Sequence, residues 1–282
     1  ESMVLRFVFI GTLIFTCWAQ SEPLIVTSGD MGSYTIEIDA AVDGQWRRFQ
    51  LDTGANSTIV TADEQTFSYP STEKAMHRGA AGVAVECEVI RPDELRVASL
   101  QVVRPAISRC DHGFTGFNNM GLEVIAGQIV ELNFQHSIMQ FHVTSPEDQN
   151  WRALKRHANG HLGILVQAGG VERGAIFDTG AQLSAVDKEF VLAHPEMFTP
   201  LPSQTPVSNI TGKPVAADFY ELNEIAIEGL KVKKLVVIAF DFGPDLRQYF
   251  GSDTPFILGT NVIVKANWIL DLKANRWAVT TF

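Results

Sequence analysis

Positive charge is scarce in this sequence. It has 22 Lys and Arg residues against 32 Asp and Glu residues, which gives a formal net charge of −10 at pH 7. A protein that binds the phosphates of nucleic acid normally carries the opposite excess. The only basic clusters, residues 152–156 and residues 231–234, are short, and such clusters are more often solvated faces than binding patches. We therefore expect no nucleic-acid partner.

The sequence also lacks the usual signatures of metal and cofactor chemistry. Its seven His residues are scattered without the spacing of metal ligands, and no glycine-rich loop precedes a helix. No Ser-His-Asp or Cys-His arrangement for nucleophilic catalysis is recognisable. The sequence therefore predicts no bound metal and no cofactor.

Cysteine is rare, with three residues in the chain. One of them, Cys17, lies in the N-terminal leader described below, which leaves Cys87 and Cys110. In an oxidising compartment these two could form a disulfide, and otherwise they would be free, buried thiols. The sequence alone leaves both alternatives open.

Long apolar runs are missing after residue 19, so we expect no later segment to span a membrane. At the N-terminus, Arg6 is followed by an apolar run over residues 7–15 and by small residues near Ala19. This order is typical of a secretory signal peptide, which we predict over residues 1–19. An uncleaved membrane anchor is the alternative, although the run is shorter than the ~20 residues that a spanning helix needs. We expect an exported protein, either secreted or periplasmic.

What the sequence does contain is one tetrapeptide twice. Asp52-Thr53-Gly54-Ala55 returns as Asp178-Thr179-Gly180-Ala181, and each copy follows a large apolar residue. An aspartate between a strand-like apolar run and Thr-Gly is expected at the end of a buried strand, where glycine permits a tight turn. A single copy would most often be a solvated turn. Two copies in matching surroundings indicate an internal duplication.

The residues before the two copies match. A glycine lies eight residues before each aspartate, at Gly44 and at Gly170. Before each glycine is a run of alternating character, over residues 34–40 and residues 161–167. Both halves are therefore predicted to begin with a β-hairpin that leads into the Asp-Thr-Gly turn.

Later segments of the two halves correspond as well. An apolar run ends in glycine at residues 124–127 and again at residues 256–259. Each half then closes with a second predicted hairpin, over residues 132–141 and residues 270–279. In this alignment the second half carries about six extra residues between its glycine and its closing hairpin.

The duplication predicts two similar lobes, residues 20–147 and residues 148–282. The polar segment 144–150 is the best candidate for the linker between them. In the second lobe, an Asp at position 187 and a Pro at position 195 bound a segment that predicts a short helix over residues 187–194.

One hairpin of the first lobe has glycine at both ends of its turn. Residues 74–90 contain Gly79-Ala80-Ala81-Gly82 between alternating strand residues. Such glycines permit positive φ and bending, so we predict a mobile hairpin that covers a cleft and contacts the substrate. Plain hairpins without this role are common too.

These residues together resemble the aspartic proteases of the pepsin and retropepsin superfamily. The motif Leu51-Asp52-Thr53-Gly54-Ala55, followed by Ile59-Val60, is similar to the retroviral type, while two lobes in one exported chain are similar to pepsin. The resemblance extends over residues 34–282. It implies an all-β fold with short helices, in which two similar lobes are related by a pseudo-twofold axis.

The resemblance implies that Asp52 and Asp178 form a catalytic dyad, one residue from each lobe. Two carboxylates ~3 Å apart cannot both ionise, so the pair shares one proton. The ionised member takes a proton from a water molecule, while the protonated member donates to the scissile carbonyl.

The residues that follow each aspartate are implied to support the dyad. The threonines would form hydrogen bonds across the lobes, and the glycines with the next amides would hold the carboxylates coplanar. These residues are Thr53, Gly54, Ala55, Thr179, Gly180 and Ala181. Behind the dyad, Gly127 and Gly259 would let the neighbouring strand pass closely.

The expected function is an aspartic endopeptidase, a hydrolase that cleaves extended polypeptides and acts as a monomer because one chain supplies both aspartates. The alternative is a catalytically inactive peptide-binding protein on the same fold, although inactive members usually lose an Asp or the Thr-Gly after it. Ala55 and Ala181 lack the hydroxyl that pepsin-like sites use to favour an ionised carboxylate. We therefore expect an activity optimum at roughly pH 4 to 6 rather than near 2.

Overall fold

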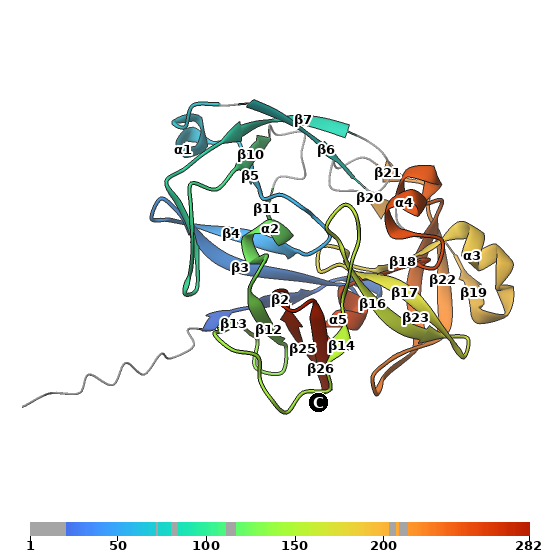
Figure 1. Ribbon diagram of the computed structural model, residues 1–282. Helices are drawn as coiled ribbons and strands as arrows, with labels where there is room; N and C mark the ends of the chain where they lie inside the picture. The colour runs from blue at the N-terminus through green and yellow to red at the C-terminus, as the bar shows by residue number, and fades with distance from the viewer. Residues whose placement is uncertain (1–20, 72, 80–83, 111–116, 203–206, 209–213) are drawn as a thin grey trace, which may run out of the picture.

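The computed structural model describes residues 21–282 apart from residues 72, 80–83, 111–116, 203–206 and 209–213. The predicted signal peptide, residues 1–19, lies outside the described residues, and so do Ala80, Ala81 and Gly82 of the predicted hairpin turn. The described chain is built mainly from β-strands, which form three large sheets and one sheet of two strands, β20 (Val207–Ser208) and β21 (Pro214–Val215) (Figure 1).

The first lobe is built on a ten-stranded sheet, coloured from blue to green in Figure 1. Its strands β3 (Tyr34–Val42) and β4 (Gln45–Asp52) are joined by a two-residue turn at Asp43-Gly44. Both turn residues have positive φ, 47° and 78°, as a tight hairpin of this kind requires. The other strands are β2 (Ile25–Ser28), β5 (Ile59–Thr61), β6 (Glu73–Arg78), β7 (Ala84–Ile90), β8 (Glu94–Val97), β9 (Leu100–Val103), β10 (Ile107–Cys110) and β11 (Asn118–Gly121).

An eight-stranded sheet forms the second lobe. Strands β16 (Leu162–Ala168) and β17 (Val171–Phe177) are joined at Gly169-Gly170, where φ is 59° and 76°. The two hairpins predicted before the Asp-Thr-Gly turns are thus confirmed. The other strands of this sheet are β15 (Lys155–Arg156), β18 (Ser184–Asp187), β19 (Phe198–Leu201), β22 (Asp218–Ile227), β23 (Leu230–Phe240) and β24 (Phe256–Leu258).

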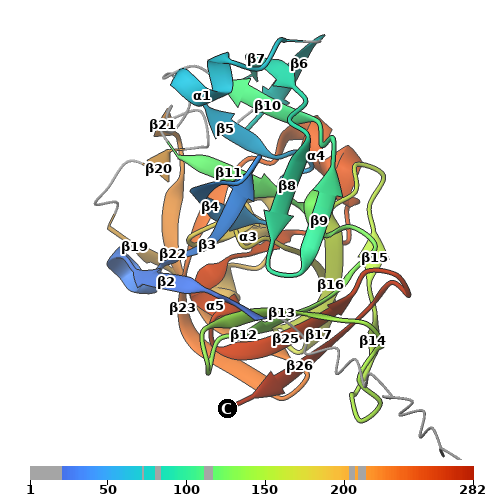
Figure 2. The same ribbon diagram turned by 90° about the vertical axis from the view of Figure 1, so that its left-hand side faces the viewer.

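A six-stranded sheet joins the two lobes, and its strands lie in the lower part of the molecule in Figure 2. It contains both predicted closing hairpins, β12 (Ile129–Asn133) with β13 (Ile138–His142) and β25 (Ala266–Asp271) with β26 (Arg276–Thr281). Strand β12 pairs antiparallel with β25, so the two hairpins lie side by side in one sheet. Its edge strands are β1 (Ser21–Pro23) and β14 (Arg152–Ala153).

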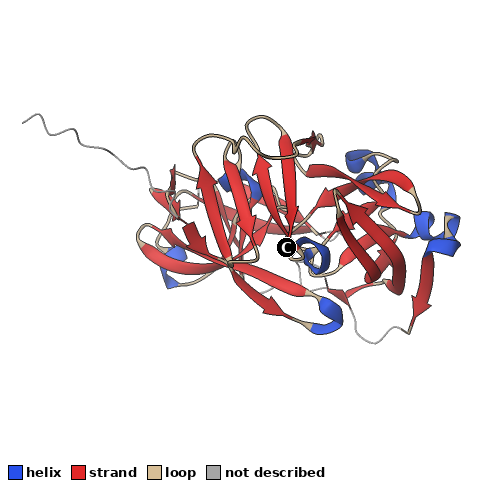
Figure 3. Ribbon diagram, turned by 90° about the horizontal axis from the view of Figure 1, so that it is seen from below, coloured by secondary structure: helices blue, strands red, loops and turns tan. Residues whose placement is uncertain are grey.

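The helices are short, as Figure 3 shows in blue. Helix α3 (Lys188–Ala193) begins after Asp187, whose side chain accepts a hydrogen bond from the Glu189 amide, so the helix predicted before Pro195 is confirmed. The others are α1 (Glu64–Phe67), α2 (Leu122–Ile125), α4 (Gly243–Phe250), α5 (Thr260–Ile263) and the 3-10 turns Asp30–Gly32 and Pro195–Met197. No helix in the described part of the chain is long and apolar enough to cross a membrane. The predicted fold class, all-β with two lobes and short helices, is confirmed.

One hydrophobic core runs through both lobes and the joining sheet. Phe49 of β4, Phe177 of β17, Trp268 of β25 and Trp277 of β26 are all buried in it. The rings of Phe177 and Trp268 pack edge to face with centroids 5.0 Å apart. The strand that leads to Asp178 therefore rests directly on the joining sheet.

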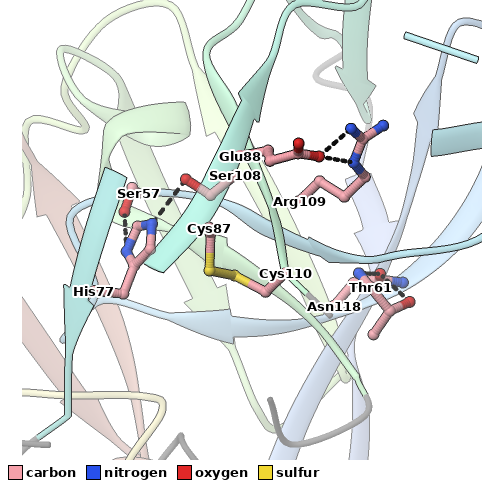
Figure 4. The surroundings of a disulfide bond; sticks show 9 residues. All are labelled: Ser57, Thr61, His77, Cys87, Glu88, Ser108, Arg109, Cys110 and Asn118. Carbon is pink, nitrogen blue, oxygen red and sulfur yellow. Dashed lines mark hydrogen bonds and ion pairs between the residues drawn. A yellow bond between two sulfur atoms is a disulfide. The ribbon is translucent and has the colours of Figure 1, made fainter. Parts of the chain in front are cut away.

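Cys87 of β7 and Cys110 of β10 form a disulfide, with Cα atoms 4.7 Å apart (Figure 4). Both residues are buried, and their strands are antiparallel neighbours in the first lobe. The structure therefore decides between the two alternatives that the sequence left open, in favour of the disulfide.

Candidate active site

The two aspartates end equivalent strands. Asp52 is the last residue of β4, and Asp178 directly follows β17. In the first lobe, β11 lies between β4 and β5, parallel to the former and antiparallel to the latter. In the second lobe, β24 lies in the same way between β17 and β18. The two turns thus occupy equivalent frameworks, as the predicted duplication requires.

Each inserted strand leads to a glycine that packs against the turn. A Cβ on Gly121 would lie 2.6 Å from the carbonyl carbon of Ser57, and a Cβ on Gly259 would lie 2.6 Å from that of Leu183. No side chain fits at either position. Gly127 instead has a φ of +74° and no atom within 4 Å of a Cβ placed on it. The assignment of Gly127 was therefore wrong: it is a turn residue after α2, and Gly121 is the counterpart of Gly259.

The error has a physical origin in the composition of β11. This strand has Asn-Asn-Met before its glycine, whereas β24 has Phe-Ile-Leu, so the apolar pattern pointed to a later glycine. With Gly121 aligned to Gly259, Leu132 and Leu270 both lie eleven residues after their glycine, and the six extra residues disappear.

A matching pair of hydrogen bonds supports the corrected alignment. The amide of Gly121 donates to Thr58 Oγ1 at 3.1 Å, and the amide of Gly259 donates to Ser184 Oγ at 3.0 Å. Both hydroxyls follow an Asp-Thr-Gly turn at the same distance along the chain. The same backbone contact therefore recurs in both lobes.

The two turns are joined across the lobes by their threonines. The amide of Thr53 donates to Thr179 Oγ1 at 3.0 Å, and the amide of Thr179 donates to Thr53 Oγ1 at 3.1 Å. Each hydroxyl donates in turn to a carbonyl of the other lobe, Thr53 to Phe177 and Thr179 to Leu51, both at 2.8 Å. Both threonines are fully buried. The structure thus brings them into the reciprocal arrangement that the resemblance implies.

The turn glycines lie against the carboxyl group of the opposite lobe. A Cβ on Gly54 would lie 2.3 Å from Cγ of Asp178, and a Cβ on Gly180 would lie 2.3 Å from Cγ of Asp52. The amide of Gly54 donates to Asp52 Oδ1 at 2.9 Å, and that of Gly180 donates to Asp178 Oδ1 at 2.8 Å. The two carboxyl groups share a hydrogen bond. Both aspartates and both glycines therefore belong to one site.

The alanines after the glycines differ in what their amides bind. The Ala181 amide donates to Asp178 Oδ1 at 3.1 Å, so Asp178 accepts two hydrogen bonds from its own turn. The Ala55 amide donates instead to the main-chain oxygen of Asp52, at 3.2 Å. The two carboxyl groups are therefore held differently.

Asn119 is a site residue that the sequence analysis missed. Its Nδ2 donates to Asp52 Oδ2 at 2.7 Å, and the residue is fully buried in β11. Ile257 occupies the equivalent position in β24, two residues before the glycine, and offers no such donor. The only signal in the sequence is the polar pair Asn118-Asn119 before Gly121. Asn119 of β11 thus gives Asp52 a side-chain hydrogen bond of the kind that Ala55, which lacks a hydroxyl, cannot donate.

Burial is the largest cause that raises the pKa of both carboxyl groups. It raises the pKa of Asp52 to about 7, together with the negative charge of Asp178, while hydrogen bonds from Asn119 and Gly54 act in the opposite direction. Burial also raises the pKa of Asp178, against the turn amides that lower it. Because the two groups share a hydrogen bond, they titrate as a unit and hold one proton between them over a wide pH range. A carboxyl pair of this kind can supply an acid and a base at once.

Gly79, the described residue of the predicted hairpin turn, directly follows β6. The described part of this hairpin is bound to the first aspartate turn through His77. Its Nδ1 lies 3.2 Å from Ser57 Oγ and its Nε2 lies 2.8 Å from Ser108 Oγ, as Figure 4 shows. Ser57 belongs to the segment that follows Ala55. The structure thus holds β6 beside the Asp52 turn, through a histidine that the sequence analysis did not single out.

The described residues offer no metal centre, since no group of three or more His, Cys, Asp or Glu side chains among them could hold an ion. Two histidines, His157 and His161, flank one hairpin loop and pack against the ring of Phe250, with centroids 6.0 Å and 5.6 Å from it. The second of these reaches the aspartate site.

Two β lobes whose Asp-Thr-Gly turns meet at an approximate twofold axis define the fold of the aspartic proteinases. Residues 164–262, which make up most of the second lobe, match the family model described as aspartyl protease. The structure is similar to the crystal structure of the aspartic proteinase from Irpex lacteus, with a TM-score of 0.58 and 12% sequence identity over 93% of this chain and 97% of that chain. No curated protein sequence matches the chain. The predicted resemblance to the pepsin and retropepsin superfamily is confirmed, and family model and fold together support a protease, which is a hydrolase.

Proposed function

We propose that this protein is an aspartic endopeptidase that cleaves extended polypeptides with Asp52 and Asp178 as its catalytic residues. The observation that carries the proposal is the meeting of two half-buried carboxyl groups, one from each lobe, in a hydrogen-bonded pair. Thr53 and Thr179 hold this pair from both sides. A peptide-binding protein without catalysis would have no need for a carboxyl pair that shares a proton.

The chemistry follows from the shared proton. The ionised carboxylate takes a proton from a water molecule, whose oxygen attacks the scissile carbonyl carbon while the protonated carboxyl donates its proton to the carbonyl oxygen. Collapse of this intermediate breaks the C–N bond, and a proton passes to the leaving amine. The raised pKa of Asp52 supports this, because one carboxyl stays protonated in mildly acidic solution.

The substrate is proposed to be a polypeptide in extended form, bound along the line where the lobes meet. Extended peptides bind β-rich sites through main-chain hydrogen bonds, with side-chain pockets that set the preference. Contacts remote from the cut then contribute to positioning, so dipeptides should be poor substrates.

The decisive experiment uses Asp52→Asn and Asp178→Asn. Each change keeps the side-chain volume and removes the shared proton, so either should lower kcat by at least about a thousandfold while the protein stays folded and still binds pepstatin or substrate peptide. Cleavage products from a peptide library would be followed by mass spectrometry. Undiminished cleavage by either variant would reject the dyad, whereas binding without cleavage by the unchanged protein would favour the inactive peptide-binding alternative.

The proposed enzyme is exported and acts as a monomer. The Cys87–Cys110 disulfide supports export, because such bonds persist in oxidising compartments. One chain supplies both aspartates, so specific activity should stay constant on serial dilution.

A further inference from the structure

The glycine carbonyls of the two Asp-Thr-Gly turns are each bound by a side chain of the opposite lobe. Gln50 Nε2 donates to the carbonyl oxygen of Gly180 at 3.0 Å, and His161 Nε2 lies 2.6 Å from the carbonyl oxygen of Gly54. A carbonyl oxygen only accepts, so Nε2 of His161 carries the proton. The two bonds cross the lobe boundary in opposite directions.

These two contacts do not follow from the duplication. Gln50 and Ile176 both lie two residues before their aspartate, and His161 and Thr35 both lie seventeen residues before theirs. Ile176 has no side-chain donor and therefore cannot repeat the contact of Gln50. Thr35 does not repeat the contact of His161. Each lobe reaches the carbonyl of the other through a residue of its own.

Gln50 is connected to one carboxyl group through a single peptide. The carbonyl of Gly180 and the amide of Ala181 belong to the same peptide group, and that amide donates to Asp178 Oδ1 at 3.1 Å. A hydrogen bond to the carbonyl polarises the peptide and strengthens the bond that its N–H makes. Gln50 is itself buried, with 7% of its surface exposed, so water does not compete strongly for this contact.

His161 holds the other turn. Gly54 donates its N–H to Asp52 and accepts from His161 at its carbonyl, so the residue is fixed at both ends. The titratable groups that face His161 are Asp52 across the lobe boundary and His157 on its own hairpin loop, while Phe250 packs on its ring. Burial lowers the pKa of His161, and the Gly54 carbonyl and the charge of Asp52 raise it. Its Nδ1 is buried and has no hydrogen-bond partner among the described residues, so a second proton there would lack an acceptor and would place a positive charge beside the dyad.

We propose that Gln50 and His161 are positioning residues of the aspartate dyad, each holding the glycine carbonyl of the opposite turn, and that His161 also brings a titratable charge to Asp52. The consequence for catalysis rests on the proposed function, whereas the coupling between His161 and Asp52 does not.

The kinetic test replaces each donor by leucine, which is similar in size but cannot donate a hydrogen bond. Gln50→Leu and His161→Leu should each lower kcat at least tenfold with KM changed less than about threefold, because the carboxyl geometry is disturbed and the substrate contacts are not. His161→Gln keeps an N–H near the position of Nε2 and cannot titrate, so it should retain kcat within about twofold and lose any inflection that the imidazole contributes to the pH profile. His157→Gln, which packs on the same Phe250 without reaching Gly54, is the matched control and should keep the pH profile. Wild-type kcat in both leucine variants would overturn the proposal.

An NMR titration tests the proposal without any peptide substrate. The carboxylate of Asp52 favours the imidazolium, so Asp52→Asn should lower the pKa of the His161 ring and change that of His157 less. In Gln50→Leu, the carboxyl carbon of Asp178 should titrate at a higher pH, because its amide donor is weakened. These shifts in a protein that cleaves no peptide would reject the proposed function and retain the positioning role. Unchanged titrations of both groups would overturn the proposal whether or not the protein is active.

Discussion

At the scale of single residues, Gly121 and Gly127 differ in the space that they leave for a side chain. Gly121→Ala should unfold the site or abolish activity, because its Cβ would meet the Ser57 backbone at 2.6 Å. Gly127→Ala should remain active, because the new side chain has open space around it and only the positive φ destabilises the fold, by about 1 kcal/mol. Denaturant unfolding and peptide cleavage would be measured on both. If Gly127→Ala proved the more damaging change, the corrected alignment with Gly259 would be wrong.

The hydrogen bond from Asn119 lowers the pKa of Asp52, whereas burial raises it. Its amide favours the ionised carboxylate, so Asn119→Leu should raise the pKa at which the dyad first ionises and move the acidic limb of the activity profile to higher pH. Ala55→Ser would add a donor and should move the same limb to lower pH. The pH dependence of kcat/KM reports both limbs. Limbs that stay in place in both variants would show that neither donor controls the dyad.

The residues of the two turns were predictable because the duplication repeats them in order. Asp52, Asp178 and the threonines and glycines after them stand in one short motif, whose chemistry requires those residue types. Asn119, Gln50 and His161 were not predictable, because each meets its partner across 67, 130 and 107 positions of the chain. Contacts over such separations leave no local pattern, and none of the three is repeated by the equivalent residue of the other lobe.

At the scale of elements, turn chemistry predicted the hairpins, whereas the hydrophobic pattern failed to predict strand β11. Gly44 and Gly170 mark tight turns with positive φ, which a local sequence reveals. Strand β11 pairs in parallel with β4, far away in the sequence, and its two asparagines break the apolar pattern that marks β24. A buried polar residue at a functional site is where reasoning from hydrophobic pattern is expected to fail.

The disulfide between β7 and β10 should stabilise the element that carries His77. It closes a loop between residues 23 positions apart, for which loop-closure entropy suggests about 3 kcal/mol. The double variant Cys87→Ala with Cys110→Ala should lose about that much unfolding free energy in urea. Reduction of the unchanged protein should have a similar effect. A loss below about 1 kcal/mol would mean that the strand pairing of β7 with β10 already restricts this loop in the unfolded chain.

At the scale of the whole molecule, two lobes were predictable and their joining sheet was not. The closing hairpins carry a clear alternating pattern, but nothing local announces that β12 and β25 pair with each other. This pairing and the threonine bonds place the two aspartates at one axis, so the dyad depends on the relative position of the lobes. The interactions of the dyad should therefore contribute to the free energy of unfolding of the whole protein.

The dyad makes stability depend on pH with a definite sign. The folded-state pKa of Asp52 is raised to about 7, so between its ordinary value near 3.8 and about 7 the folded protein holds a proton that the unfolded chain releases. This contribution is fully present below the ordinary pKa and is lost as the pH rises through about 7. The wild-type protein should thus lose up to about 4 kcal/mol relative to Asp52→Asn between pH 4 and pH 7, since one pKa unit corresponds to about 1.4 kcal/mol.

Asp63→Asn is the matched control, because its titration has the opposite sign. The hydrogen bond from Arg47 is the first cause that lowers the pKa of Asp63, to about 2, so its contribution is present above its ordinary pKa and is lost as the pH falls toward 2. Urea unfolding of the three proteins from pH 2 to pH 8 should therefore show two separate differences. The Asp63→Asn curve should join that of the wild type at the acidic end, while the Asp52→Asn curve should gain on the wild type as the solution approaches neutrality. A constant offset between Asp52→Asn and the wild type across this range would mean that the carboxyl pair ionises in the folded protein as freely as it does in the unfolded chain, and that the shared proton does not exist.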